Sequence, residues 1–555
     1  MWRLAQAEQL WGTLPLFFLL ATWLAVVAFR QNAERAHLLA WGSLAGALLG
    51  IGMAPYGAIW APVLGFAGLL ILVDRLHAAA VTRRHTLWYG YHAMVVFNVV
   101  ATWWVANTAL AAGIVANFLN ALFQAIVILV VAQARRHLPR YWLLGAVVLW
   151  VGFEFLHFNW QIAWPWLCVG HTFSTAPALA QWFSWTGVFG GSCYVTLAGV
   201  GAYSIWTARP SRRTVATILT AAALPLLGSL VYFLTAEPAR GSRVRIAAVQ
   251  PNFEPHYRKF SIPRGEQLRQ FDGLTAEALS RGADLVVYPE TSFGGVDEDQ
   301  FEAEPFYAMW TAQQAYYPGV GLLTGLSSYR RYASPVDDPA LRTQARGPGG
   351  AVYYIAHNSA LGIDAEGRRS LYYKSKLVPG VEFLPYRRAL FFFEPLVARL
   401  GGTTAGLGRS DSASVFHYSN GIAAAPLICY ESIYGDYVRD FVSRGANVLV
   451  VPTNDGWWDD SPGYRQHFDL ARLRAIETRR YVVQAANSGT SGFIDERGRA
   501  YATTDYDVAA VTVDEIELLQ GQTVYVRYGD VLGWLAAGGA VLVVMAWSWA
   551  MWRAR

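Results

Sequence analysis

The sequence has 555 residues, a formal net charge of +5 and a mean hydropathy of +0.25. A chain of this length exceeds what one hydrophobic core usually organises, so we expect at least two domains. The three cysteines are an odd number and lack metal-ligand spacing, which argues against a disulfide framework and a cysteine metal site. The arginines cluster in short loops between apolar segments, which argues against a nucleic-acid-binding surface.

The chain up to about residue 235 carries long apolar runs and no lysine. A membrane-spanning helix needs roughly 17 to 25 apolar residues, and the tryptophan-rich composition fits membrane interfaces. We predict a multi-pass α-helical membrane domain over residues 1–234, and a last transmembrane helix with a short cytoplasmic tail over 531–555. The apolar segments are 12–29, 37–53, 58–74, 88–107, 112–133, 141–157, 187–206, 214–234 and 531–551.

The loops between these segments alternate in positive charge. The positive-inside rule places the arginine-bearing loops in the cytoplasm and the arginine-free loop at 160–181 outside. Carrying the alternation forward puts residues 235–530 outside as well. The first segment is interpreted as retained, because no small-residue cleavage pattern follows it. The charged loops and tail contain Arg30 and Arg35; Arg75, Arg83 and Arg84; Arg135, Arg136 and Arg140; Arg209, Arg212 and Arg213; and Arg553 and Arg555.

Glu154 and His157 form an ionisable pair near one end of the sixth apolar segment. A carboxylate there is unfavourable without a partner, and His157 at i+3 can provide one. Two interpretations stay open. The pair contacts a lipid headgroup or the outer domain, or it is a helix-end group that reaches interfacial water.

Residues 235–530 alternate short β-branched runs with helical patterns. Nearly continuous apolar strands predict sheets covered on both faces, hence an α/β domain outside the membrane. We expect strands at 245–250, 284–288, 320–326, 352–363, 423–429, 447–452, 481–487 and 509–513, and helices at 267–280, 304–316, 432–443 and 466–480.

Two charged residues in this region suit acyl-transfer chemistry. Glu290 follows Pro289 at a strand end, where partial burial would raise the pKa of a general base toward the working pH; a helix cap or surface ion pair is the alternative. Lys374 is one of only three lysines, and a compact ammonium suits an oxyanion better than a planar guanidinium. Lys376 competes with it, because alternation on a strand gives both the same face.

Cys429 is the only cysteine outside the membrane domain and follows an apolar strand. A thiol becomes more nucleophilic when a cation or a helix N-terminus lowers its pKa. We expect both influences at Cys429, from Lys374 and from a helix starting near Ser432. The alternative is an inert buried cysteine.

Aromatic residues mark two further places. The stretch 383–397 is either a lid that dips into the membrane and admits acyl chains or an ordinary buried helix. Trp457 and Trp458 favour the lid slightly, because amphipathic aromatics prefer the membrane interface. Asn454 and Asp455 before them are typical of a turn.

Four segments in chain order resemble the carbon-nitrogen hydrolase (nitrilase) superfamily, and the membrane domain narrows the resemblance to the apolipoprotein N-acyltransferase family. They are Pro289-Glu290; Tyr372-x-Lys374-x-x-Leu377-Val378-Pro379 with Glu382 following; Ile428-Cys429-Tyr430-Glu431; and Asn454-Asp455-x-Trp457. The resemblance implies an α-β-β-α sandwich over 235–530. It implies catalytic roles for Glu290, Lys374 and Cys429, and supporting or substrate-orienting roles for Glu382, Tyr430, Glu431, Asn454 and Trp457.

Three positions depart from the family pattern. The sequence has Pro379-Gly380-Val381-Glu382 where the family usually has Pro-Phe-Gly-Glu. It has His157 where the family tends to have arginine, and Phe260 roughly where the family has a tryptophan on a mobile arm.

The resemblance also implies a reaction without metal or cofactor. Cys429 would attack the sn-1 ester of a phospholipid to form a thioester, and the α-amine of a diacylglyceryl-cysteine lipoprotein would accept the acyl chain. The implied partners are the phospholipid donor, the lipoprotein acceptor and the membrane, without nucleic acid. The implied location is the bacterial inner membrane, with the catalytic domain on the periplasmic face. The alternatives are a membrane-tethered nitrilase-type amidase or lipid esterase, and a non-catalytic binding protein that kept the fold.

Overall fold

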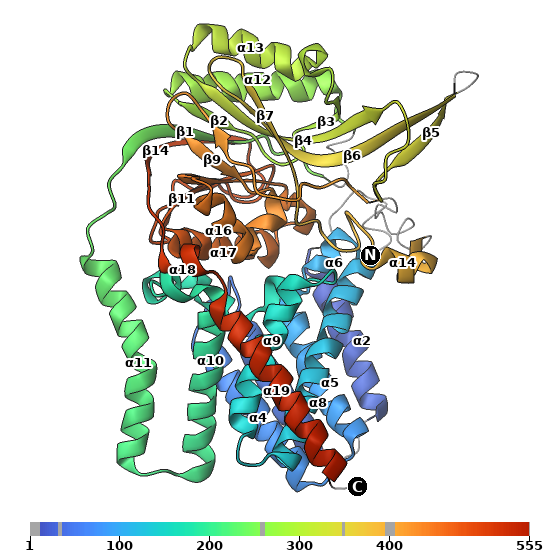
Figure 1. Ribbon diagram of the computed structural model, residues 1–555, viewed down its shortest axis with the longest axis vertical. Helices are drawn as coiled ribbons and strands as arrows, with labels where there is room; N and C mark the ends of the chain where they lie inside the picture. The colour runs from blue at the N-terminus through green and yellow to red at the C-terminus, as the bar shows by residue number, and fades with distance from the viewer. Residues whose placement is uncertain (1–11, 31–35, 256–260, 347–349, 395–405, 554–555) are drawn as a thin grey trace. The chain divides into compact units, whose positions relative to one another are not determined.

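The computed structural model describes residues 12–30, 36–255, 261–346, 350–394 and 406–553. Arg35, Phe260, Arg555 and residues 395–397, which entered predictions above, lie outside this part of the chain. The chain divides into two compact units (Figure 1). The helical unit combines Met1–Ala236, Ser461–Leu473 and Tyr528–Arg555, and the sheet unit combines Glu237–Asp460 and Arg474–Arg527.

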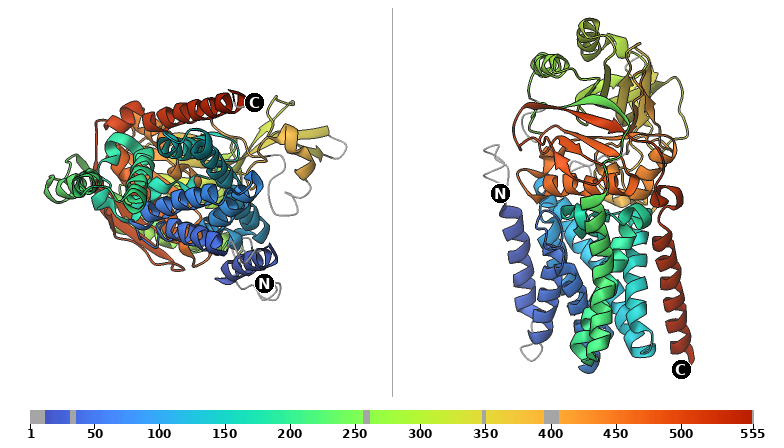
Figure 2. Two further views of the ribbon diagram at one scale, coloured as in Figure 1. Left: turned by 90° about the horizontal axis from the view of Figure 1, so that it is seen from below. Right: turned by 90° about the vertical axis from the view of Figure 1, so that its left-hand side faces the viewer.

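Each predicted apolar segment falls on a helix of the helical unit, and these helices run roughly side by side (Figure 2). Six helices in the described residues are long and apolar enough to cross a membrane: 61–78, 110–137, 142–159, 183–208, 212–235 and 531–553. The length and apolar composition of these helices therefore confirm the prediction of a membrane helical domain. The helices are α2 Leu14–Arg30, α3 Ala36–Ile51, α4 Ala61–Ala78, α5 Arg83–Thr102, α8 Asn120–His137, α9 Trp142–Asn159, α10 Phe183–Ala208, α11 Arg212–Thr235 and α19 Val531–Arg553.

Small residues and buried amides hold these helices together. A Cβ on Gly46 of α3 would lie 2.2 Å from the Ala93 carbonyl oxygen of α5, so only glycine permits this approach. Between α5 and α8, Asn98 donates to Gln124 Oε1 at 2.6 Å. Close backbone approach and interhelical hydrogen bonds are the forces expected between helices in lipid, where the hydrophobic effect adds little.

The expected pairing of Glu154 with His157 is wrong. Glu154 Oε1 accepts from Trp150 Nε1 at 2.9 Å and from the Val169 backbone N–H at 2.8 Å. His157 Nδ1 instead accepts from Trp160 Nε1 at 2.8 Å. Both side chains are buried, so neither reaches water from the helix end. Glu154 thus bonds to the loop backbone and an indole, and it thereby fixes the segment after α9 to that helix.

Two sheets make up the core of the sheet unit. The first has the order β14-β1-β2-β4-β6-β5, with β3 beside β4 and β7 beside β6, and the second has the order β13-β12-β11-β10-β9-β8. The strands are β1 Ser242–Gln250, β2 Leu285–Val287, β3 Phe293–Asp297, β4 Gly321–Tyr332, β5 Arg342–Arg346, β6 Gly350–Ile363, β7 Arg369–Tyr373, β8 Phe416–His417, β9 Ala423–Pro426, β10 Val448–Thr453, β11 Tyr481–Ala486, β12 Gly492–Ile494, β13 Ala500–Tyr501 and β14 Ala510–Leu518.

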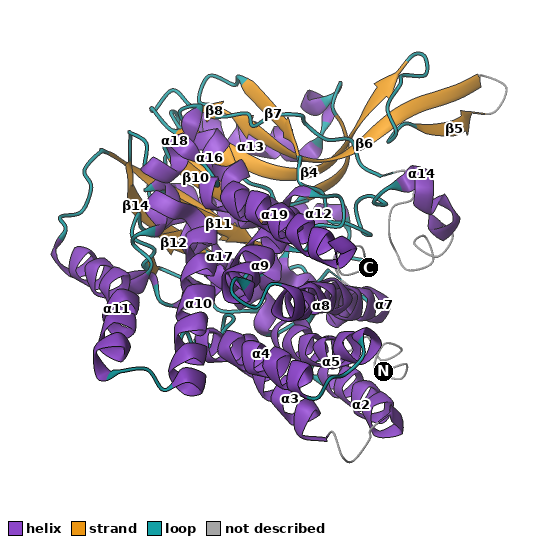
Figure 3. Ribbon diagram, turned by 60° about the horizontal axis from the view of Figure 1, so that its bottom comes forward, coloured by secondary structure: helices purple, strands orange, loops and turns teal. Residues whose placement is uncertain are grey.

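Helices cover the outer faces of both sheets (Figure 1), and Figure 3 distinguishes these helices from the strands by colour. On the first sheet, α12 Arg264–Ser280 and α13 Pro305–Tyr316 place Phe271 and Trp310 in one buried cluster with Val286 and Leu322. On the second, α16 Gly435–Ser443 packs beside β9. The predicted α-β-β-α sandwich is therefore confirmed.

All eight predicted strands are present, while the short strands β3, β5, β7, β8, β12 and β13 were not predicted. One difference between the predicted and observed elements lies at Cys429. Strand β9 ends at Pro426 instead of at Cys429, and α16 begins at Gly435 instead of near Ser432. A single 3₁₀ turn, Cys429–Ile433, separates them.

Candidate active site

Cys429 opens the 3₁₀ turn between the second sheet and α16. Its φ of +51° lies in the left-handed region, which is unfavourable for a residue with a Cβ. Two hydrogen bonds hold the turn: Ile428 N donates to Glu431 Oε2 at 2.8 Å and Ser432 Oγ donates to the Cys429 carbonyl at 2.8 Å. Backbone strain maintained in this way often marks a functional residue. As a whole residue, Cys429 is partly exposed.

Glu290 reaches the site from the end of β2, where the chain turns directly over β4. Gly325 of β4 makes this approach possible, because a Cβ there would lie 2.6 Å from the Glu290 Cα. The Gly325 N–H donates to the Pro289 carbonyl at 3.1 Å, and Ser292 N donates back to the Gly325 carbonyl at 2.9 Å. Glu290 is thus anchored through its own backbone turn and is 7% exposed.

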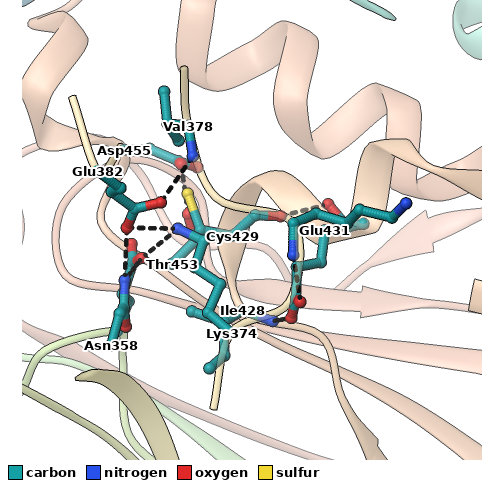
Figure 4. Close-up of polar contacts among 12 residues, drawn as sticks. Asn358, Lys374, Val378, Glu382, Ile428, Cys429, Glu431, Thr453 and Asp455 are labelled. Carbon is teal, nitrogen blue, oxygen red and sulfur yellow. Dashed lines mark hydrogen bonds and ion pairs between the residues drawn. The ribbon is translucent and has the colours of Figure 1, made fainter. Parts of the chain in front are cut away.

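Lys374 follows β7 and lies between two carboxylates (Figure 4). Its ammonium donates to Glu290 Oε1 at 2.9 Å and to Glu382 Oε1 at 3.1 Å. Asn358 of β6 donates through Nδ2 to the same two oxygens, at 2.7 and 2.9 Å. The Lys374 side chain is 1% exposed, so these contacts act with little screening by water.

Lys374 lowers the pKa of the Cys429 thiol as expected, but the net shift is upward and opposite to the prediction. Burial and the Glu290 carboxylate raise the pKa of the Cys429 thiol well above its usual value, and the Lys374 ammonium only partly counters them. The helix expected to assist is replaced by the 3₁₀ turn, so its dipole does not start at Cys429. The Cys429 thiol is therefore neutral at rest.

The expected rise of the Glu290 pKa is also wrong. Burial raises the pKa of its carboxyl, but the Lys374 ammonium and the Asn358 and Cys429 hydrogen bonds together hold it below its ordinary value. The carboxylates in turn raise the pKa of Lys374 well above its ordinary value, against the effect of burial. The site thus rests as carboxylate, ammonium and thiol, with the thiol hydrogen-bonded to Glu290 as the proton acceptor.

Glu431 joins the nucleophile turn to the lysine loop. Besides Ile428 N, its carboxylate accepts from Ser375 N at 2.7 Å, Lys376 N at 3.2 Å and the Tyr372 hydroxyl at 2.6 Å. Burial raises its pKa to about 7 although these donors favour the charged form. Glu431 therefore holds Cys429 and Lys374 at a fixed separation from a position outside the reacting centre.

Glu431→Ala is expected to lower the free energy of unfolding of the sheet unit by about 3 kcal/mol, because one buried and two part-buried backbone N–H groups lose their acceptor. Denaturant unfolding of the purified protein measures this change. Tyr372→Phe is the matched control, since it removes one hydroxyl from the same cluster and should lower stability by only about 1 kcal/mol. Equal losses in the two variants would contradict this role.

The other predicted residues occupy different positions. Lys376 lies over the Tyr434 and Tyr437 rings, 5.2 and 5.4 Å from their centroids, so Lys374 is the lysine that meets Glu290. Tyr430 is buried with its ring 5.2 Å from that of Tyr434. It therefore supports the nucleophile turn from within the core.

The segment after β10 carries three further residues near the candidate site: Asn454, Asp455 and Trp457. Asn454 Oδ1 accepts from Asn487 Nδ2 at 3.0 Å, which ties two loops together. Trp457 lies half-buried in the 3₁₀ turn Asp455–Trp458. Asp455 is fully buried, accepts from Thr453 Oγ1 at 2.6 Å, and lies close enough to Cys429 to raise the thiol pKa.

Sequence reasoning missed Asn358, which donates to both site carboxylates. The available signal was its place in the predicted apolar strand 352–363, where a polar side chain needs a hydrogen-bonding partner.

Comparisons with known proteins match both units. The carbon-nitrogen hydrolase model matches residues 245–524, and the model of the apolipoprotein N-acyltransferase N-terminal domain matches residues 45–201. An apolipoprotein N-acyltransferase of Chlorobaculum tepidum is 29% identical, over 91% of this chain and 95% of that protein. Another, of Bradyrhizobium diazoefficiens, is 30% identical over 71% and 70% of the two chains.

Solved structures resemble the sheet unit at low identity. An amidase from Nesterenkonia sp. is 19% identical, covers 53% of this chain and 96% of its own, and superposes with a TM-score of 0.32. A carbon-nitrogen hydrolase from Helicobacter pylori is 16% identical, covers 50% and 89%, and has a TM-score of 0.33.

Proposed function

The chain belongs to the apolipoprotein N-acyltransferase family of carbon-nitrogen hydrolases, and on that premise we propose that it transfers an acyl chain from a phospholipid to the N-terminal α-amine of the diacylglyceryl-cysteine of lipoproteins. The acyl chain passes through a thioester on Cys429. The observation that carries this proposal is the contact of one thiol, one carboxylate and one ammonium in a single site: Cys429, Glu290 and Lys374.

In the first half-reaction, Cys429 Sγ attacks the carbonyl carbon of the sn-1 ester. Because the thiol is neutral at rest, its proton passes to Glu290 as the carbon–sulfur bond forms. The tetrahedral intermediate then expels the glycerol oxygen, which takes the proton from Glu290 and leaves as lysophospholipid. The products are the thioester and an unprotonated Glu290.

In the second half-reaction, the lipoprotein α-amine attacks the thioester carbonyl and Glu290 accepts the amine proton. The carbon–sulfur bond breaks, an amide remains on the lipoprotein, and the departing sulfur regains the proton from Glu290. The enzyme thus returns to carboxylate, ammonium and thiol. Water must be excluded from the site between the first and second half-reactions, because hydrolysis of the thioester competes with acyl transfer to the amine.

Lys374 stabilises the oxyanion of both tetrahedral intermediates. A lysine ammonium has three N–H donors, and its hydrogen bonds to Glu290 and Glu382 use two of them. The third can meet an oxyanion without breaking either contact. Such preorganised donors are often the largest single contribution to acyl-transfer catalysis.

The charge alternation of the loops supports a periplasmic reaction in the bacterial inner membrane. We place a membrane domain at 1–234, a catalytic domain at 235–530 on the periplasmic face, and a C-terminal transmembrane helix with a cytoplasmic tail at 531–555. A phospholipid donor and a lipoprotein acceptor are both available at that membrane face. Glu382, Tyr430, Glu431, Asn454 and Trp457 support the site in this proposal.

The decisive experiment incubates the purified protein in detergent micelles with a phospholipid labelled in its sn-1 chain. We expect a hydroxylamine-sensitive adduct that Cys429→Ala does not form, and that a diacylated lipopeptide removes as labelled triacylated product. Release of labelled fatty acid without transfer would identify a lipid esterase instead. Failure of the wild-type protein to form an adduct or turn over lipid would refute the proposal.

A further inference from the structure

A second polar cluster lies behind the active site, on the strands that supply Asn358 and Lys374. Side chains alternate faces along a strand, so His357 and Tyr373 point away from the site that their neighbours form. Their rings stack with centroids 3.8 Å apart and an interplanar angle of 14°. The two residues thus pair across β6 and β7 directly behind the two side chains that hold Glu290 and Glu382.

Glu298 binds both of these residues through one buried carboxylate. His357 Nδ1 lies 2.8 Å from Oε1, the Tyr373 hydroxyl donates to Oε2 at 2.6 Å, and Ser328 Oγ donates to Oε1 at 2.7 Å. The side chains of Glu298 and His357 are only 3% and 5% exposed. Burial raises the pKa of Glu298, but these hydrogen bonds hold it below its ordinary value, so the group is a carboxylate.

The cluster fixes the backbone on which the active-site groups stand. Glu298 follows β3, Ser328 lies in β4, His357 in β6 and Tyr373 at the end of β7, so four strands meet at one carboxylate. Immediately beyond it, Lys374 N donates to the Asn358 carbonyl at 2.8 Å. A shift of Tyr373 therefore moves Lys374, and a shift of His357 moves Asn358.

The cluster buries a carboxylate, an imidazole and two hydroxyls. Burial of such polar groups is unfavourable unless each is hydrogen-bonded, and apolar side chains in the same place would avoid this cost. Directional hydrogen bonds, unlike apolar contacts, specify one geometry. We propose that Glu298, His357 and Tyr373 are positioning residues for the acylation of Cys429, which keep Asn358 and Lys374 aligned with Glu290 and Glu382. This inference rests on the proposed function.

The test compares Tyr373→Phe with Tyr418→Phe. Tyr373→Phe removes the bond to Glu298 and keeps the ring that stacks on His357. Tyr418 is more buried than Tyr373, and its hydroxyl donates to the Leu322 carbonyl at 3.0 Å, away from the cluster. Tyr418→Phe should therefore lose at least as much stability and controls for that loss. Single-turnover thioester formation is measured against phospholipid concentration, together with the thermal midpoint of each variant.

We expect Tyr373→Phe to lower the maximal acylation rate constant about 10-fold without changing the half-saturating phospholipid concentration, as a small misplacement of catalytic groups does. Its thermal midpoint should fall no further than that of Tyr418→Phe, whose acylation rate should stay near wild type. Glu298→Gln, which keeps the side-chain shape, should retain more activity than Glu298→Ala. Equal rates in the two tyrosine variants would overturn the inference.

A second readout separates this inference from the proposed function. Alkylation of Cys429 by iodoacetamide, followed by peptide mass spectrometry, needs the aligned thiol and base but no lipid. If the wild type forms no thioester, the proposed function fails, and slower alkylation of Cys429 in Tyr373→Phe than in Tyr418→Phe would still support the positioning role. Equal alkylation rates would overturn that role whatever the lipid assay shows.

Discussion

Lys374→Met is expected to slow acylation of Cys429 by about 1000-fold or more. One cause is the loss of the oxyanion donor, since removal of a single such donor costs about 100- to 1000-fold. The second is the loss of the cation that holds the pKa of Glu290 down. Glu290 and Glu382 share the Asn358 amide at 2.7 and 2.9 Å, and a neighbouring carboxylate that no cation offsets disfavours the charged form of Glu290. The measurement is the single-turnover rate of thioester formation.

The pH dependence of the acylation rate distinguishes the loss of the cation beside Glu290 from the loss of the oxyanion donor. In the wild type Glu290 is ionised through the neutral range, so the acylation rate should be flat there and fall only in acid. In Lys374→Met the pKa of Glu290 rises, because burial is no longer offset, and the rate should increase as pH rises through neutrality. Lys374→Arg keeps the charge but lacks the compact ammonium geometry, so it should stay slow while keeping the flat wild-type profile.

Lys376→Met is the matched control for Lys374→Met. It removes the same side chain two residues away, where the ammonium faces Tyr434 and Tyr437 instead of the site carboxylates. Acylation in this variant should remain within a few-fold of wild type. If the two variants were equally slow, Lys374 would have no special role and the assignment of the oxyanion donor would be wrong.

The residues of the candidate site could be predicted because each lies in a short local pattern at a strand end. Glu290 follows β2, Lys374 follows β7, and Cys429 lies three residues after β9. Strand ends of a sandwich gather at one edge, so residue types with complementary chemistry at several ends indicate a site. The structure brings these three residues together.

What could not be predicted depends on contacts between distant segments. Asn358 meets Glu290 and Glu382 only because β6 pairs with β7 and β4, and no local pattern encodes those pairings. The signs of the Glu290 and Cys429 pKa shifts depend on how burial and three neighbouring charges combine. Glu298 gave no signal, since a single acidic residue after a short unpredicted strand is typical of a surface loop.

Glu290→Gln is expected to lower the acylation rate about 1000-fold near neutral pH, in line with the loss of a general base. The amide oxygen of glutamine can still accept from Lys374 and Asn358, so the site should keep its geometry. The amide cannot take the proton of Cys429, however. Burial, the largest cause of the raised thiol pKa, remains in the variant, although the Glu290 carboxylate no longer adds to it. Little thiolate therefore forms without a proton acceptor, and most of the nucleophile is lost.

The rate in Glu290→Gln should therefore depend on the thiolate that solvent alone can generate, and should rise about tenfold per pH unit. The wild-type rate should stay flat from about pH 5 to about pH 8, because a carboxyl with a lowered pKa remains ionised there. The ratio of the wild-type acylation rate to the Glu290→Gln rate should thus fall steadily as pH increases. Glu366→Gln, at an exposed glutamate paired with Arg368, is the control and should match wild type at every pH. A Glu290→Gln enzyme with a flat profile and a rate near wild type would show that another group accepts the Cys429 proton.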